Sequence, residues 1–295
     1  MQNDRTLRFW DDFYNAQEPS SDKEWILQPS QPLLQRLSQC LEKRASCRIL
    51  EIGCGTSSLG RELWKYMRTN PPAGEEQPSV HLLATDVSEV CIRQNQERDS
   101  ELIDQGENTS LEYKVLNIVK SDPELEGKFD FILDKGCLDT FLFRSRQRGG
   151  GSQSYGEHVR SAIDNIQSWL SKDGVYVILS PRIKFKTVRD YAGFSSVDRF
   201  ELNPAELQLG DLEGEEGDNG CLFLYVCHKN PAYSSSSDEA FPRDQEQFPD
   251  EDSCQTCGVT FVEFRKGEDL SGRGEVFWRR QWKGHCAHCK KARTP

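Results

Sequence analysis

Apolar residues recur along this chain with two different periods. Within residues 1–47 they return every three or four positions, so that Leu33, Leu34 and Leu37 share one side of a predicted helix. Beyond residue 47, short apolar runs typical of buried strands alternate with stretches of helical period. The predicted strands span residues 47–52, 80–86, 111–117, 129–134, 173–180 and 221–229. The predicted helices between them span residues 57–67, 87–99 and 157–172.

Strands that are apolar on both faces and alternate with helices predict a parallel sheet covered by helices on each side. The fold class is therefore α/β. A glycine-rich stretch, residues 146–156, predicts a loop before the last helix. Composition then divides the chain into four parts. They are a helical cap at residues 1–47, an α/β core at 48–230, an acidic flexible linker at 231–252 and a cysteine-containing module at 253–295.

Composition and charge exclude some classes of protein. The net charge of −11 argues against a protein that coats nucleic acid along its whole length. No run approaches the roughly 18 apolar residues that span a bilayer, so we expect no membrane association. The first residues lack the apolar core of a signal peptide and the acid-poor character of a transit peptide. We therefore expect a cytoplasmic or nuclear protein with reduced cysteines. The oligomeric state stays open, and we assume a monomer.

The stretch ILEIGCGTSSLG, residues 49–60, runs from a strand through two glycines to the start of a helix. In an open parallel sheet, ligands bind at the carboxyl ends of the strands, so Gly53 and Gly55 are placed for close contact with a ligand. A dinucleotide site would have a third glycine at Ser58, and a phosphate-binding P-loop would end in Gly-Lys-Ser or Gly-Lys-Thr. Neither pattern is present. A turn that only packs tightly is the alternative.

Two acidic residues narrow the choice of ligand. Glu51 lies at the end of the first predicted strand, and Asp86 ends the second. A carboxylate at Asp86 can accept hydrogen bonds from both hydroxyls of a ribose, and an acid beside the glycine turn suits an ammonium or sulfonium group. S-adenosylmethionine has these groups and no phosphate. We therefore expect it to be the cofactor.

Four motifs carry a resemblance to a known family. LEIGCGTSSL, LLATDVS and above all FDFILDKGCLDTFL resemble the seven-stranded S-adenosylmethionine-dependent methyltransferases of the methyltransferase-like group. Within it, the lysine methyltransferases of elongation factor 1-alpha and of citrate synthase have a similar Leu-Asp-Lys-Gly, here residues 133–136. FWDDFY resembles an N-terminal motif shared with the tRNA 3-methylcytosine methyltransferases. The resemblance covers about residues 7–229 and implies a doubly wound, mostly parallel, Rossmann-like sheet of seven strands.

The resemblance also implies which residues contact the methionine and ribose parts of the cofactor. Gly53 and Gly55 would lie against the methionine part. Glu51, placed beside them by its position in the sequence, completes the set. Asp86 would bind the ribose, and Asp134 would lie near the methionine amino group. These five residues come from the ends of three predicted strands.

The adenine and the cover of the site involve other segments. Trp10 and Tyr14 would close the site from above. The residue ending strand three, followed by Ile118, would meet the adenine. The family commonly has aspartate there, whereas this chain has Asn117, whose carbonyl can still accept a hydrogen bond from the adenine amino group. We expect the protein still to bind the cofactor, with a lower affinity because asparagine replaces aspartate.

Catalysis of methyl transfer consists mainly of aligning the nucleophile and excluding water. For a lysine substrate, Asp134 or Asp139 would help to orient the amine, with a helix-start or surface carboxylate as the alternative for Asp139. Lys135 is expected to pair with a neighbouring acid. Cys137 lacks the preceding proline of a cytosine-C5 nucleophile, and a buried thiol is the favoured interpretation.

Four cysteines near the C-terminus have the spacing of a metal site. CQTC and CAHC are two C-x-x-C pairs separated by twenty-eight residues, and two such pairs supply the four thiolates that structural zinc prefers. His285 and His288 are alternative ligands. The expected ligands of a structural Zn²⁺ are Cys254, Cys257, Cys286 and Cys289.

The same module reverses the charge of the chain. Residues 253–295 contain nine Lys and Arg against four Asp and Glu, and two tryptophans lie among six of these basic residues. Such a ribbon suits RNA, because arginines contact phosphates and rings stack on bases. It equally suits an acidic protein, the acidic linker or solvent.

Three functions follow from these features. The first is a methyltransferase that acts on a protein lysine, favoured by the Leu-Asp-Lys-Gly strand end and by acidic loops that attract a basic target. The second is an RNA, and especially tRNA, methyltransferase that uses the basic ribbon. The third is a non-catalytic interaction module, hinted at by Asn117. The sequence does not identify the methylated molecule, the number of methyl groups or what the ribbon binds.

Overall fold

The computed structural model describes residues 3–16, 24, 27–41, 46–71, 78–103, 109–144, 152–180, 185–202 and 222–233. Within these ranges, the helices are α1 (Asn3–Asn15), α2 (Gln31–Gln39), α3 (Leu59–Thr69), α4 (Glu89–Arg98), α5 (Cys137–Arg144), α6 (Ser152–Trp169) and α7 (Lys186–Arg189), with a 3₁₀ turn η1 (Pro123–Leu125). The strands are β1 (Ser46–Ile52), β2 (Ser79–Asp86), β3 (Thr109–Val115), β4 (Phe129–Lys135), β5 (Leu170–Ser180), β6 (Phe194–Glu201) and β7 (Phe223–Lys229).

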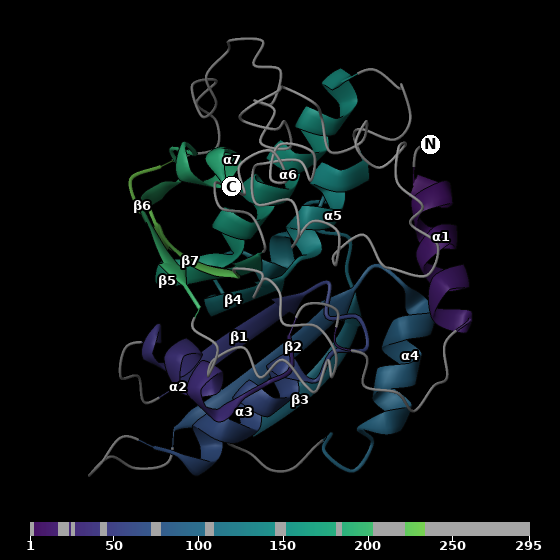
Figure 1. Ribbon diagram of the computed structural model, residues 1–295, viewed down its shortest axis with the longest axis vertical. Helices are drawn as coiled ribbons and strands as arrows, with labels where there is room; N and C mark the ends of the chain where they lie inside the picture. The colour runs from purple at the N-terminus through teal and green to yellow at the C-terminus, as the bar shows by residue number, and fades with distance from the viewer. Residues whose placement is uncertain are drawn as a thin grey trace, which may run out of the picture.

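The strands of the described residues form one seven-stranded sheet in the order β3-β2-β1-β4-β5-β7-β6 (Figure 1). β1 pairs in parallel with β2 and β4, and the pairs β2–β3 and β4–β5 are also parallel. β7 is antiparallel to both β5 and β6. The strand order reverses between β1 and β4, which is where open α/β sheets bind ligands. The predicted mostly parallel α/β sheet is confirmed.

Successive residues of the central strands point into two separate apolar layers. In β4, Phe131 and Leu133 lie in one layer and Ile132 lies in the other, and Val177 and Ile178 of β5 alternate in the same way. Residues of α2 and α3 complete the first layer, and residues of α6 complete the second (Figure 1). Because both faces are covered, these strands are apolar almost throughout.

The structure corrects four of the predicted boundaries. The edge strand β6 was missed, because only Phe194 of its eight residues is buried and no apolar run marks it. β3 ends at Val115, two residues before the predicted end. α6 begins at Ser152, inside the predicted glycine-rich loop, and β5 begins at Leu170, where the helix was expected to continue. The first strand begins at Ser46, inside the predicted helical cap.

The acidic linker beyond residue 233 and the whole cysteine-containing module lie outside the described residues. The domain limits, the flexible linker and the zinc ribbon therefore stay predictions. No helix in the described ranges is long and apolar enough to cross a membrane.

Candidate cofactor site

The turn after β1 has a conformation that glycine adopts at little cost. Gly53 and Gly55 have φ angles of 58° and 54°, in the left-handed region. A Cβ atom on Gly53 would lie 2.5 Å from the Cys137 sulfur, and one on Gly55 would lie 3.0 Å from the Tyr14 hydroxyl oxygen. Both glycines are thus required by backbone conformation and by close neighbours, and any ligand at this turn meets bare backbone.

Asp86 lies at the carboxyl end of β2, beside the glycine turn, and is buried. Its carboxylate accepts hydrogen bonds from the backbone N–H groups of Gly55, at 3.1 Å, and Ser88, at 2.9 Å. Burial raises the pKa of Asp86 to about 6, against the opposing effect of these hydrogen bonds. An ionised carboxylate has about four acceptor positions, so Asp86 keeps capacity for ribose hydroxyls.

Glu51 is the second carboxyl group of the site and lies near the end of β1, with an exposed fraction of 3%. The backbone N–H of Gly60 faces this carboxyl group and favours its ionised form. Among the described residues, its Oε1 atom has no hydrogen-bond partner. Burial raises the pKa of Glu51 to about 8, although the positive charge of Lys135 opposes the shift. A buried carboxyl oxygen without a donor is suited to an ammonium group of a ligand.

Asp134 is the last residue but one of β4, where it is paired with Ile52 of the adjacent strand β1, and it is fully buried. It accepts hydrogen bonds from the backbone N–H groups of Cys137 and Leu138, at 2.6 and 3.1 Å, and from the Tyr176 hydroxyl at 2.7 Å. Burial nevertheless raises the pKa of Asp134 to about 7, helped by the charge of Asp139. These three donors are all neutral, so they stabilise the ionised carboxylate of Asp134 without forming an ion pair.

Asp139 lies in the first turn of α5 and is 2% exposed. Asp139 is thus a helix-start residue but not a surface carboxylate, and its role in orienting the amine stays a prediction. Burial raises the pKa of the neighbouring Cys137 thiol well above its ordinary value, helped by Asp134. Cys137 is thus a neutral thiol packed against the glycine turn, and it is partly buried where a buried thiol was expected.

Helix α1 brings its aromatic residues to the glycine turn and lies beside α4 (Figure 1). Tyr14 is buried and Trp10 stacks on it, with ring centroids 6.0 Å apart. Two hydrogen bonds join α1 and α4: the Ser88 hydroxyl donates to Asp11, and Gln94 donates to the carbonyl of Tyr14 at 3.3 Å. The two aromatic residues predicted to close the site therefore lie next to it.

Asn117 and Ile118 follow β3 rather than ending it. The Asn117 side-chain oxygen accepts a hydrogen bond from the backbone N–H of Val119 at 3.0 Å. Ile118 is buried, and its carbonyl accepts from Asn165 of α6 at 2.9 Å. Hydrogen bonds at Asn117 and at Ile118 thus hold in place the chain segment that is predicted to contact the adenine.

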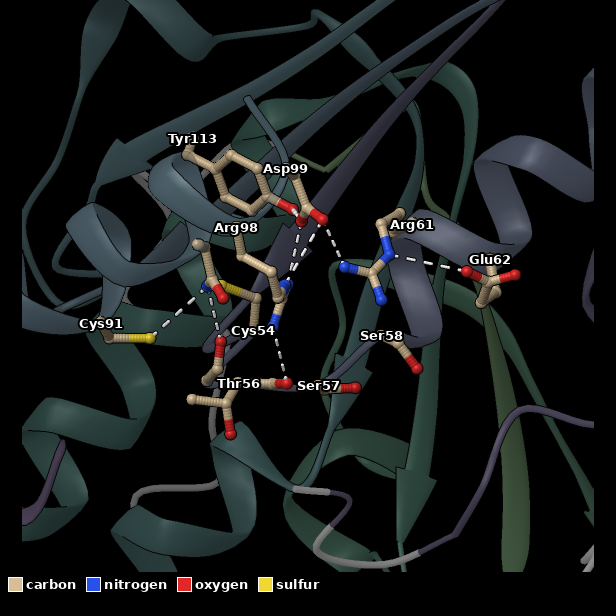
Figure 2. Close-up of polar contacts among 12 residues, drawn as sticks. Cys54, Thr56, Ser57, Ser58, Arg61, Glu62, Cys91, Arg98, Asp99 and Tyr113 are labelled. Carbon is tan, nitrogen blue, oxygen red and sulfur yellow. Dashed lines mark hydrogen bonds and ion pairs between the residues drawn. The ribbon is translucent and has the colours of Figure 1, made fainter. Parts of the chain in front are cut away.

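A polar network beside the glycine turn was not predicted from the sequence (Figure 2). Arg98 donates to the carbonyl of Thr56, at 3.2 Å, and to the carboxylate of Asp99, at 2.9 Å. Arg61 and Tyr113 donate to the same carboxylate. Burial favours a higher pKa for Asp99, but these donors outweigh it and hold its pKa below the ordinary value. The network ties the turn to α3, α4 and β3. A polar helix face gives no sequence signal for it.

Asn95 adds a second support from α4. Its side-chain amide donates to the carbonyl of Gly55 at 2.8 Å, and the residue is 1% exposed. A lone asparagine in a polar helix also gives no sequence signal of such a role.

Lys135 forms a buried ion pair with Glu24, and the two side chains are 5% and 1% exposed. The expectation that Lys135 pairs with an acid is confirmed, and the acid comes from far away in the sequence. Glu24 also accepts hydrogen bonds from the Ser57 hydroxyl, at 2.9 Å, and from the Ser58 backbone N–H, at 2.7 Å. Burial favours a higher pKa for Glu24, but Lys135 and these donors hold it below the ordinary value.

One group of metal-capable side chains occurs within the described residues. Ligand atoms of Cys54, Asp86 and Cys91 lie within 4.8 Å of one another, and all three residues are buried. Asp86 already accepts two backbone hydrogen bonds there. The four cysteines expected to bind zinc lie outside the described residues.

The residues of the site come together at the carboxyl edge of β1, β2 and β4. The donor-free oxygen of Glu51 fits an ammonium group, Asp86 has capacity for ribose hydroxyls, and the glycine turn leaves its backbone uncovered by side chains of its own. These acceptor groups fit the ammonium group and the ribose hydroxyls of S-adenosylmethionine. The assignment of individual contacts to Trp10, Tyr14, Asn117, Ile118 and Asp134 stays a prediction.

Solved structures with a similar fold have low sequence identity to this chain. The [4+2]-cyclase SpnF superposes with a TM-score of 0.50 and 12% identity, over 78% of this chain and 97% of that one. Phosphoethanolamine N-methyltransferase 1 of Haemonchus contortus, solved with phosphoethanolamine and S-adenosylhomocysteine, gives 0.48 and 15%, over 80% and 51%. A TehB-like SAM-dependent methyltransferase of Corynebacterium glutamicum gives 0.40 and 16%, over 77% and 98%. Such similarity concerns the fold alone, and a fold does not fix a reaction.

A family match is more informative than these superpositions. Residues 43–212 match a family described as a methyltransferase domain. The match covers more than half of the chain and contains the glycine turn together with the ends of β2 and β4. The chain therefore belongs to the methyltransferase domain family.

Proposed function

We propose that this protein transfers a methyl group from S-adenosylmethionine to the side chain of a lysine in another protein. The observation that carries the proposal is a set of three buried carboxyl groups around the glycine turn, none of which takes part in an ion pair within the described part of the chain. They are Glu51, Asp86 and Asp134. Membership of the family supports S-adenosylmethionine as the methyl donor.

Buried carboxyl groups without a cation suit a ligand with two positive centres. S-adenosylmethionine supplies a methyl group on a positively charged sulfur, so transfer needs chiefly an aligned nucleophile and the exclusion of water. Glu51 would bind the ammonium group, and Asp86 would bind the ribose hydroxyls. Trp10 and Tyr14 would cover the site from α1. Pairing each buried carboxylate with a positive group offsets the desolvation of both.

A lysine substrate must lose a proton before its nitrogen can attack the methyl carbon. Asp134 would accept this proton, and Asp139 at the start of α5 would help to orient the amine. The pKa of Asp134, raised by burial to about 7, suits a group that exchanges a proton near neutral pH. During transfer the new N–C bond forms as the C–S bond breaks, and its electron pair stays on sulfur. The Leu-Asp-Lys-Gly strand end supports a lysine substrate by resemblance.

The test combines the full-length, zinc-loaded protein with tritiated S-adenosylmethionine and a cell extract, which is then divided between RNase and protease treatment. The proposal predicts a label that survives RNase and runs with one protein band. Loss of the label on RNase treatment would favour the RNA alternative, in which the basic C-terminal module recognises RNA. Absence of label, together with absence of cofactor binding by calorimetry, would favour a non-catalytic module.

A matched pair of variants separates the site from the fold. Asp86→Ala is expected to reduce labelling by about 10- to 100-fold without unfolding the protein, because hydrogen bonds to a charged group are lost. Asp190→Ala removes an exposed carboxylate after α7 and is expected to leave labelling unchanged. Unchanged labelling in Asp86→Ala would refute the ribose role of Asp86.

A further inference from the structure

Glu51 and Lys135 lie on neighbouring strands and point to the same face of the sheet. Glu51 of β1 is paired with Leu133 of β4, so Lys135, two residues further along, is its diagonal neighbour. Ile49 and Leu133, which precede these two residues by two positions, lie in one apolar layer, in agreement with a common face. The positive charge of Lys135 accordingly acts on the Glu51 carboxyl group.

The ion pair of Lys135 is nevertheless made with Glu24 and not with Glu51. Glu24 is itself held by the residues that follow the glycine turn: hydroxyl groups of Ser57 and Ser58 donate to it at 2.9 Å, and the backbone N–H of Ser58 donates at 2.7 Å. Its side chain is 1% exposed, so water does not compete for these donors. Glu24 thus fixes the position of the Lys135 ammonium group.

We propose that Glu24 is a positioning residue that holds Lys135 away from Glu51, so that the donor-free oxygen of Glu51 stays available for the ammonium group of the cofactor. This inference rests on the proposed function, because it takes the cofactor to be S-adenosylmethionine. Without Glu24, the long side chain of Lys135 would turn to its diagonal neighbour. The lysine would then occupy the place of the ligand.

Within the described residues, two cations act on the Glu51 carboxyl group, and Lys135 is the one that Glu24 holds in place. Arg98 of α4 also acts on the Glu51 carboxyl group. Its guanidinium donates to Asp99 and to the carbonyl of Thr56 (Figure 2). Removing Glu24 therefore redirects Lys135 and leaves Arg98 in place.

The experiment measures the affinity of S-adenosylhomocysteine by calorimetry for the full-length protein and two variants. Glu24→Gln keeps the shape of the side chain but releases Lys135, and is expected to weaken binding about tenfold, the effect of losing one charge-assisted hydrogen bond. Glu24→Gln combined with Lys135→Met removes the competing cation as well. It is expected to bind within about threefold of the unaltered protein. Methylthioadenosine, which lacks the ammonium group, should bind all three proteins equally.

These outcomes separate positioning from architecture. If the Glu24–Lys135 pair only supports the fold, the double variant binds as weakly as Glu24→Gln, and the inference is overturned. Equal affinity of Glu24→Gln and the unaltered protein overturns it too. The double variant leaves no unpaired buried charge and so is the one expected to fold most readily. If the single variant does not fold, loss of affinity in the double variant still overturns the inference.

The pH profile supplies an independent readout. In the unaltered protein, affinity for S-adenosylhomocysteine should rise with pH as Glu51 ionises, up to about pH 8. In Glu24→Gln, the loss of the Glu24 charge and the approach of Lys135 both favour ionised Glu51, so this rise should shift to lower pH, and by more than in the double variant, which lacks the lysine. An unshifted profile contradicts the inference. Failure of the unaltered protein to bind S-adenosylhomocysteine would remove the proposed function, and the inference with it, whereas normal binding with unchanged variants removes the inference alone.

Discussion

Buried carboxyl groups occur in two different settings around the glycine turn. Glu24 is paired with Lys135 and Asp99 with arginines, and these cations hold the pKa of each carboxyl below its ordinary value despite burial. Glu51, Asp86 and Asp134 lie at the carboxyl ends of β1, β2 and β4. None of them forms an ion pair among the described residues. Burial raises the pKa of these three groups to about 8, 6 and 7.

The difference distinguishes supporting residues from residues that await a ligand. A buried carboxylate with a cation and several donors holds its neighbours in place, and removing either partner leaves a costly unpaired charge. A buried carboxyl without a cation destabilises the ligand-free protein whenever it ionises. A positively charged ligand reverses that cost, and perturbed carboxyl groups gather at functional sites for this reason. The negative charges of these three carboxyl groups are thus balanced only when a positively charged ligand is bound.

Breaking the paired set should have the largest effect. Asp99→Asn removes the buried carboxylate that Arg61 and Arg98 share, although Glu62 still faces Arg61, and is expected to lower the free energy of unfolding by about 3–5 kcal/mol. Urea unfolding of the full chain measures this loss. Asp190→Asn, which affects an exposed pair with Arg189, serves as the control and should stay within about 1 kcal/mol of the unaltered protein. A loss for Asp99→Asn as small as that of the control would contradict the supporting role.

The unpaired set should make the ligand-free protein less stable as pH rises. The folded pKa of Glu51, Asp86 and Asp134 lies above the unfolded value, so between the two values the unfolded chain binds fewer protons than the folded one. The contribution of these groups to stability is therefore present below about pH 4 and is lost as pH rises to about 8. Each unit of pKa shift corresponds to about 1.4 kcal/mol at most. Thermal unfolding between pH 5 and 8 tests the direction.

Saturation with S-adenosylhomocysteine provides the comparison for this pH series. The ligand should stabilise the protein more at pH 8 than at pH 5, because its ammonium group pairs with ionised Glu51. The Glu51→Gln variant gives the pH dependence that the other groups cause, and it is subtracted. If the remaining stability of the ligand-free protein rises with pH, the destabilising effect assigned to the unpaired carboxyl groups is contradicted.

A single substitution in the unpaired set should separate stability from binding. Glu51→Gln removes a buried charge that has no cation, so ligand-free stability at pH 8 should stay equal or increase. The same change should weaken S-adenosylhomocysteine binding about tenfold, because an ammonium group then faces a neutral amide. Calorimetry and thermal unfolding on one sample measure both quantities. Weaker stability with unchanged affinity would place Glu51 among the supporting residues instead.

The smallest expected effect concerns the adenine. Asn117→Asp restores the residue common in the resembling family, and a carboxylate accepts a hydrogen bond more strongly than an amide. Methylthioadenosine should bind about twofold to fivefold more tightly to this variant, because the bond concerned is single and partly solvated. Unchanged or weaker binding would mean that Asn117 acts only in the turn that its side chain makes with Val119.

The sequence predicted the residues of the unpaired set better than those of the paired set. Glu51 and Asp86 end apolar strands, and strand ends of a parallel sheet meet at one edge, so their proximity follows from the fold class. Gly53 and Gly55 were found for a related reason, since only a left-handed turn needs two glycines there. Position along a strand was sufficient for these four.

The paired set escaped prediction because its partners are distant in the sequence and lie on polar segments. Glu24 and Lys135 are 111 residues apart, and the sequence offers many acids as partners for one lysine. Asn95 and Arg98 lie on α4, whose polar residues have the pattern of a solvated helix face in the sequence. Only the structure shows that both side chains contact the glycine turn. β6 was missed for a similar reason, because an exposed edge strand has no apolar run.

The most direct test of the central claim is the number of protons released when S-adenosylhomocysteine binds, measured near pH 7 by calorimetry in buffers of different ionisation enthalpy. Glu51, whose pKa is raised by burial to about 8, is mostly protonated in the ligand-free protein at this pH. Pairing with an ammonium group should lower that pKa, so binding should release close to one proton, and Glu51→Gln should abolish the release. Binding without proton release would contradict the claim that the cofactor completes the charge of the site.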